Sequence, residues 1–148
     1  MKPLLIIALL KVLVLTMACR DASWRSDHEQ LVKEAELGAL ESRAFCAYRE
    51  GNDSLSIANY QRLVTDLEKE QSQQGDKGRA LRLWLAYSRL SRSLERAGRL
   101  AEAQEAQNMS KTLHMKLFPE MSHKPNEIQQ HLEMLDEKQH RLLDRRIP

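Results

Sequence analysis

The chain begins with an apolar run and continues with stretches in which apolar residues recur every three or four positions. Residues 3–18, PLLIIALLKVLVLTMA, are almost wholly apolar. From about residue 27 onward the spacing is that of helices with one face turned to a core. The pattern predicts helices over about 27–50, 53–67, 77–97, 100–118 and 125–146. The fold class is therefore predicted to be all-α.

The breaks between these stretches carry residues typical of helix ends. Asp27 is expected to cap the first helix, with Gln30 at the spacing of a capping box. Gly51 and Gly98 are expected to end helices, because glycine tolerates the left-handed conformation found there. Pro125 suits the first turn of the last helix, where its missing N–H is not needed. The breaks thus predict antiparallel helical hairpins followed by a C-terminal helix.

Three expectations concern single side chains. The helix over 100–118 is expected to turn one apolar side to the core, formed by Ala103, Ala106, Met109, Leu113 and Leu117. Cys46, in an Ala-rich helix, is expected to be a small buried residue and not a reactive thiol. His131 and His140 match no metal-ligand spacing and are expected to be ordinary solvated residues.

The apolar start has the length and flanks of an export signal. Lys2 supplies a positive charge, and a helix over residues 3–18 would span about 24 Å, less than the roughly 30 Å of a bilayer core. Lys11 also interrupts the apolar run, which disfavours permanent insertion. Residues 1–18 are therefore predicted to be a signal peptide.

The segment LTMAC at residues 15–19 resembles the lipobox of bacterial lipoproteins, in which Ala or Gly precedes a cysteine. The resemblance implies that Cys19 accepts a diacylglyceryl group, and that its amine, freed by cleavage, can take a further acyl chain such as palmitate. Several acyl chains hold a protein stably on a membrane. Arg20 stands where an inner-membrane lipoprotein typically has Asp, so the resemblance favours the periplasmic face of the outer membrane.

Two other fates of the N-terminus stay open. Ordinary signal-peptidase cleavage after Ala18 would release a soluble periplasmic protein, and an uncleaved segment would act as an anchor. With lipidation, residues 19–27 form the lipidated cysteine and a tether, and residues 28–148 form the helical domain.

Two segments can be aligned on Gly51 and Gly98. The pattern around Gly98, with Ala103 after the turn, resembles the tetratricopeptide repeat, and Ser56 takes the place of Ala103 in the first segment. Gln107 departs from the family pattern, and the glycines lie further apart than the about 34 residues of a family repeat. An unrelated helical bundle is the alternative.

The resemblance implies hairpins over about 28–118 and a capping helix over about 125–146. It also implies a concave surface that binds a peptide or another protein. Tyr87, Leu94 and Trp84 are the candidate residues of that partner groove.

Charge and motifs narrow the function. The net charge of +2 comes from Lys2 and Lys11, so the rest of the chain is balanced and a nucleic-acid partner is not expected. The sequence holds no metal-ligand, phosphate-loop or nucleophile-elbow motif, so we expect no enzyme, metal or bound cofactor. A series of arginines predicts either a basic groove or pairing with nearby carboxylates: Arg79, Arg82, Arg89, Arg92, Arg96 and Arg99.

These expectations combine into a lipid-anchored helical adaptor that binds another envelope protein or peptide, as a secretion, assembly or sensory accessory factor does. The alternatives are a soluble periplasmic protein of chaperone type and a hydrolase whose site the motifs do not reveal.

Overall fold

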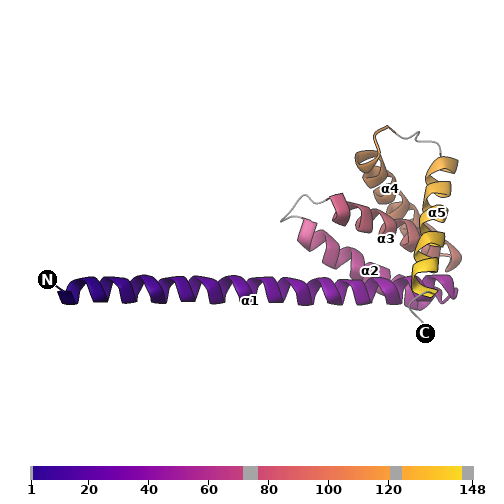
Figure 1. Ribbon diagram of the computed structural model, residues 1–148. Coiled ribbons are helices and arrows are strands. Elements are labelled where there is room, and N and C mark those ends of the chain that lie inside the picture. The colour runs from indigo at the N-terminus through magenta and orange to yellow at the C-terminus, as the bar shows by residue number, and fades with distance from the viewer. Residues whose placement is uncertain (1, 72–76, 121–124, 145–148) are drawn as a thin grey trace. The chain divides into compact units, whose positions relative to one another are not determined.

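The computed structural model describes residues 2–71, 77–120 and 125–144, with side chains at 26–69, 77–120 and 128–142. Within these residues five helices follow one another, as Figure 1 shows: α1 (Lys2–Arg49), α2 (Asp53–Gln71), α3 (Lys77–Arg96), α4 (Leu100–Leu117) and α5 (Pro125–Asp144). The described residues contain no strand, which confirms the all-α prediction.

The chain divides into two compact units, residues 1–39 and 40–148. The first unit consists of the longer part of α1. The second contains the end of α1 and the other four helices, and all further contacts described below lie within it.

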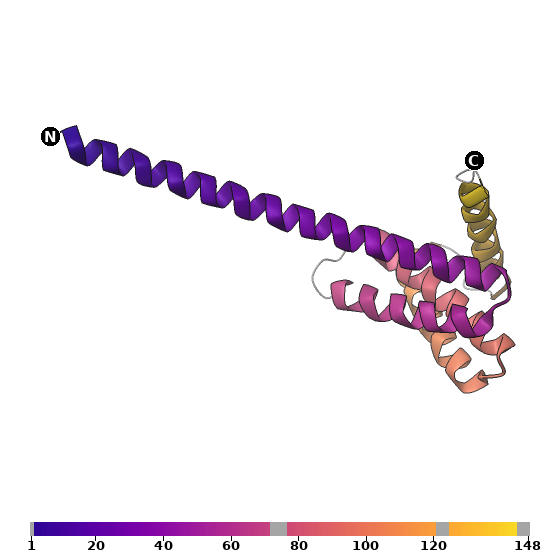
Figure 2. The same ribbon diagram turned by 90° about the horizontal axis from the view of Figure 1, so that it is seen from below.

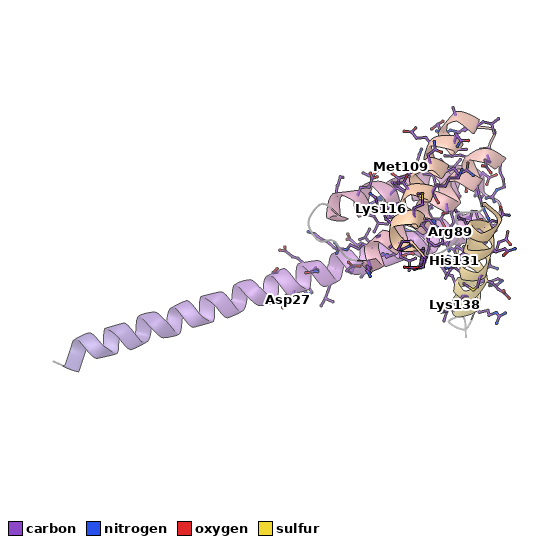
Figure 3. The ribbon with its side chains drawn as sticks, turned by 90° about the horizontal axis from the view of Figure 1, so that it is seen from above. Asp27, Arg89, Met109, Lys116, His131 and Lys138 are labelled. Atoms are coloured by element: carbon purple, nitrogen blue, oxygen red, sulfur yellow. The ribbon has the colours of Figure 1, made fainter. Side chains whose placement is uncertain are left out.

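Helix α1 begins earlier than the sequence pattern indicated. Asp27, expected at the helix start, lies inside the continuous helix (Figure 3), so that prediction is wrong. Residues 18–28 contain neither Gly nor Pro, and a residue able to cap a helix does not by itself end one. The side chains of the predicted signal peptide and of Cys19 lie outside the described residues. Where side chains are described, no helix is long and apolar enough to cross a membrane.

Helix α3 lies between α2 and α4 in the second unit (Figures 1 and 2). This central position requires a broad apolar surface, because a helix with neighbours on two sides must bury both flanks. The buried apolar side chains of this unit include Phe45, Tyr60, Leu63, Leu67, Leu83, Trp84, Leu90, Leu94, Ala103 and Leu113.

The two turns on glycine close in the same way. Gly51 has φ of 71° and Gly98 has φ of 75°, so both adopt the left-handed conformation expected of them. After the first glycine, the Asn52 N–H donates to the Ala47 carbonyl over 3.0 Å. After the second, the Arg99 N–H donates to the Leu94 carbonyl over 2.9 Å. This hydrogen bond satisfies a carbonyl that the end of a helix leaves without a partner.

Pairs of serines lie where α3 meets each of its neighbours. The Ser56 and Ser93 hydroxyl oxygens are 2.7 Å apart between α2 and α3, and those of Ser88 and Ser110 are 2.7 Å apart between α3 and α4. All four residues are buried. Small side chains let the helix backbones approach, and the paired hydroxyls satisfy one another in the interior.

Ala103 shows how close α3 and α4 come. It is 2% exposed, and its carbonyl accepts a hydrogen bond of 3.0 Å from the Ser91 hydroxyl on α3. A small residue was expected here, because the two helices of the hairpin must approach closely.

Replacing Ala103 by Phe is expected to overpack this contact and to lower the free energy of unfolding by about 1–3 kcal/mol. Ala101→Phe is the matched control, because Ala101 lies on the same helix and is exposed. Urea denaturation followed by circular dichroism measures both. Equal stability of the two variants would show that Ala103 does not lie at a tight helix contact.

Helix α4 buries Ala103, Ala106 and Leu113 on the expected side, but not Met109. Met109 is 41% exposed, whereas Ser110, Leu113 and His114 are buried. The polar residues are accommodated because Ser110 pairs with Ser88 and His114 stacks on aromatic rings. The prediction that Met109 faces the core is therefore wrong.

Candidate interaction site on helix α3

The arginines predicted as a series lie along α3 and at its end, and the structure pairs them with carboxylates. The ion pairs of these arginines join Arg82 to Glu41, Arg89 to Asp136, Arg92 to Glu133, Arg96 to Asp53, and Arg99 to Glu102. For these five, the interpretation as pairing with nearby carboxylates is confirmed. The partners of the four α3 arginines belong to α1, α2 and α5, so these arginines connect α3 to three other helices, whereas Arg99 and Glu102 lie together at the start of α4.

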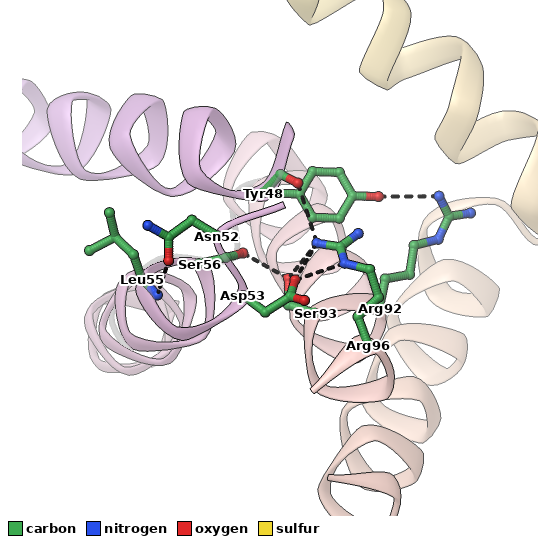
Figure 4. A network of polar contacts seen from close by, with 8 residues as sticks. All are labelled: Tyr48, Asn52, Asp53, Leu55, Ser56, Arg92, Ser93 and Arg96. Carbon is green, nitrogen blue, oxygen red and sulfur yellow. Dashed lines mark hydrogen bonds and ion pairs between the residues drawn. The ribbon is translucent and has the colours of Figure 1, made fainter. Parts of the chain in front are cut away.

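Arg96 connects α3 to the first glycine turn (Figure 4). Its Nε donates to Asp53 Oδ1 over 2.7 Å, and its Nη2 donates to the Tyr48 carbonyl over 3.3 Å. The guanidinium carbon also lies 4.9 Å from the centre of the Tyr48 ring, within range of a cation–π contact. Arg92 Nη1 donates to the Tyr48 hydroxyl over 3.3 Å. Two arginines thus hold one tyrosine at the end of α1.

Arg89 is the most deeply placed of the arginines. It is 1% exposed, and its Nε and Nη2 donate to Asp136 Oδ1 over 2.9 and 2.7 Å. Nη2 also donates to Gln139 Oε1 over 2.7 Å, so two successive turns of α5 bind one guanidinium. On the other side, the guanidinium carbon lies 4.5 Å from the centre of the Phe45 ring. Figure 3 shows Arg89 where α3 and α5 meet.

Burial of the Arg89 site affects the pKa of a nearby tyrosine and requires a negative charge to balance the guanidinium. Burial raises the pKa of Tyr60 above its usual value, and the charge of Arg89 offsets part of the rise. The Tyr60 hydroxyl therefore stays protonated at neutral pH and adds no negative charge. Asp136, with its side chain 18% exposed, supplies the charge that balances Arg89. A buried guanidinium costs much desolvation unless such a partner is present.

Four rings from α3, the end of α4 and α5 form an aromatic cluster. Trp84 lies 5.1 Å from His114 and 5.2 Å from His131, and Phe118 lies 4.9 Å from His131, between ring centres. His131 is thus half-buried, contrary to the prediction that it is solvated. His140 is also half-buried and accepts a hydrogen bond of 2.7 Å from Arg49. The prediction failed because it rested on the absence of a metal-ligand spacing, which does not indicate whether a histidine is exposed or packed.

The candidate groove residues occupy different environments. Trp84 is fully buried and Leu94 is 2% exposed, so both lie in the core. Tyr87 is half-buried, and its hydroxyl donates to Glu68 at the end of α2. Burial, followed by this hydrogen bond and the charge of Glu68, raises the pKa of Tyr87 above its usual value. Of these three residues, Tyr87 is the one whose side chain has a solvent-exposed part that a partner can contact.

Cys46 is exposed, so its predicted burial is wrong. Its neighbours Phe45 and Ala47 take the inward positions of α1 and leave the thiol on the outer face.

Two residues of the Arg89 site were not singled out in the sequence, Phe45 and Asp136. Leu132, Asp136 and Gln139 follow the four- and three-residue spacing of one helix face, which places a carboxylate beside a buried leucine. A carboxylate beside a buried leucine needs a hydrogen-bonding or positively charged partner. The spacing was therefore the signal in the sequence that indicated a polar site on this face of α5. The partner itself could not be chosen from the sequence, because the chain offers many arginines.

No protein-family model, curated protein or solved structure matches this chain. Among the residues with described side chains, no group of three or more His, Cys, Asp or Glu could hold a metal ion.

Proposed function

We propose that the protein is a lipid-anchored helical adaptor that binds another protein of the bacterial envelope. The proposal rests on one observation above all. The turns between α1 and α2 and between α3 and α4 are built on equivalent glycines with equivalent hydrogen bonds, and α3 packs against both α2 and α4. Stacked hairpins of this kind offer an extended surface to a partner, as in helical-repeat proteins.

The support for a location in the bacterial envelope comes from the sequence. The apolar residues 3–18 followed by Ala18 and Cys19 support export and lipidation, with the outer membrane favoured by Arg20. The balanced charge of the remaining chain supports a protein partner in preference to nucleic acid. The proposed adaptor therefore combines a lipid anchor at Cys19 with a binding surface in residues 40–148.

The experiment is co-purification after gentle detergent extraction, with the bound proteins identified by mass spectrometry. We expect one partner to be recovered reproducibly, and the two purified proteins to form a complex of fixed stoichiometry when mixed. A chain that is recovered alone, or whose companions do not rebind when purified, would contradict the adaptor function.

A further inference from the structure

Helix α5 buries fewer apolar side chains than α3 does and makes several polar contacts. Between residues 128 and 142, Leu132 is the apolar side chain that is buried, at 4% exposed, while Ile128 and Leu135 are half-buried and His131 packs in the aromatic cluster. Met134 and Leu142 are 58% and 55% exposed. Helix α3, by comparison, buries Trp84 and Leu94 together with several further apolar residues. Apolar burial, which secures the other helices, therefore contributes less to the position of α5.

The polar contacts of α5 converge on arginines of α1 and α3. Asp136 and Gln139 bind Arg89, as described above. Arg49 donates to His140, and Glu133 lies 3.9 Å from Arg92 at the rim. We call the surface formed by Phe45, Arg49, Arg89 and Arg92 the α5-covered face.

The residues of the α5-covered face belong to α1 and α3. Phe45 belongs to α1, and its buried ring lies against the Arg89 guanidinium, whose carbon is 4.5 Å from the ring centre. The Nε and Nη2 groups of Arg89 point to α5 and share Asp136 Oδ1. An arginine placed in this way binds a carboxylate, because its guanidinium carries several N–H donors in a fixed fork.

We propose that the α5-covered face is the partner-binding surface, and that α5 occupies it until a partner helix with the same carboxylate–amide spacing displaces it. The partner is a helix because Asp136 and Gln139 reach Arg89 from successive turns of one. It is acidic because the face presents three arginines. This inference rests on the proposed adaptor function and adds the chemistry of the partner and the way that binding is controlled.

The test uses the full chain in mild detergent and a fluorescent peptide of residues 125–144 as the probe. In the wild-type chain α5 competes with the peptide, so the apparent affinity is low. Asp136→Asn weakens the competitor and is expected to tighten peptide binding about tenfold in fluorescence anisotropy. The same substitution in the peptide is expected to weaken its binding to the Asp136→Asn chain by a similar factor.

Glu137→Gln is the matched control, because Glu137 loses the same charge on the same helix but pairs with Arg141 of α5 itself. Equal peptide binding by the Asp136→Asn and Glu137→Gln chains would overturn the proposal. So would a stable dimer of the Asp136→Asn chain, which would make a second copy the occupant.

If Asp136→Asn loses its helical circular dichroism, Gln139→Ala replaces it, since it removes one contact to Arg89 and no charge. The Gln139→Ala chain must then bind the peptide more tightly than Glu137→Gln, or the proposal fails. A negative peptide result together with a reproducible co-purified partner would reject this surface and leave the adaptor function standing.

Discussion

Substitution of Arg89 by alanine is expected to lower the free energy of unfolding by about 3 kcal/mol. Three losses combine. Asp136 is left without its positive partner in a site where its side chain is 18% exposed. Gln139 loses the donor 2.7 Å away. The stem of the arginine, which is 1% exposed, no longer fills the space above Phe45.

Urea denaturation measures the loss in the free energy of unfolding, and Arg99→Ala serves as the control. Arg99 pairs with Glu102 at the surface, and its removal is expected to leave the midpoint of unfolding unchanged. A second variant separates charge from packing. Arg89→Met combined with Asp136→Leu is expected to recover most of the stability, because a buried ion pair replaced as a whole costs little. If Arg89→Ala unfolds at the same urea concentration as Arg99→Ala, Arg89 does not hold α5 to α3.

Substitution of Cys19 by serine is expected to abolish fatty-acid labelling completely and to stop maturation. The reason is chemical, since the acyl chain is carried through a thioether that serine cannot form and the lipobox resemblance places the reacting thiol at Cys19. Growth with a labelled palmitate analogue, followed by mass spectrometry of the mature N-terminus, measures both effects.

Cys46→Ser provides the matched control, because it removes the exposed cysteine of α1 and is expected to leave labelling intact. A wild-type chain that begins at Cys19 and carries no label would contradict lipidation. Its recovery from the periplasm would support ordinary cleavage after Ala18 instead.

The sequence predicted most helix ends because their signals are local. Gly51 and Gly98 adopt positive φ, and α5 begins at Pro125. Each of these residues fixes the backbone through its own covalent geometry, so its effect does not depend on distant parts of the chain. The start of α1 was missed because Asp27 only favours a helix start, and no residue beside it stops a helix that is already running.

The site could not be predicted in the same way because its contacts join distant parts of the chain. Asp136 could pair with any of several arginines, and only the packed helices select Arg89. Met109 and His114 illustrate a related difficulty. Hydrophobicity favoured the methionine for the core, but the aromatic neighbours of α3 and α5 accept the histidine ring instead. Such choices depend on tertiary contacts that periodicity does not contain.

The two serine pairs have a consequence for cooperativity. A hydrogen bond between two serine hydroxyls lies on each flank of α3. Ser93 pairs with Ser56 of α2, and Ser88 pairs with Ser110 of α4. A slip of α3 by one residue against α2 would separate Ser93 from Ser56, and a slip against α4 would separate Ser88 from Ser110. A buried hydroxyl that loses its only partner costs about 1–3 kcal/mol. Each pair therefore fixes the register of α3 against one neighbour, and the two pairs couple α2 and α4 through α3. The two hairpins should melt in a single calorimetric transition, in contrast to an array of independently folding repeats.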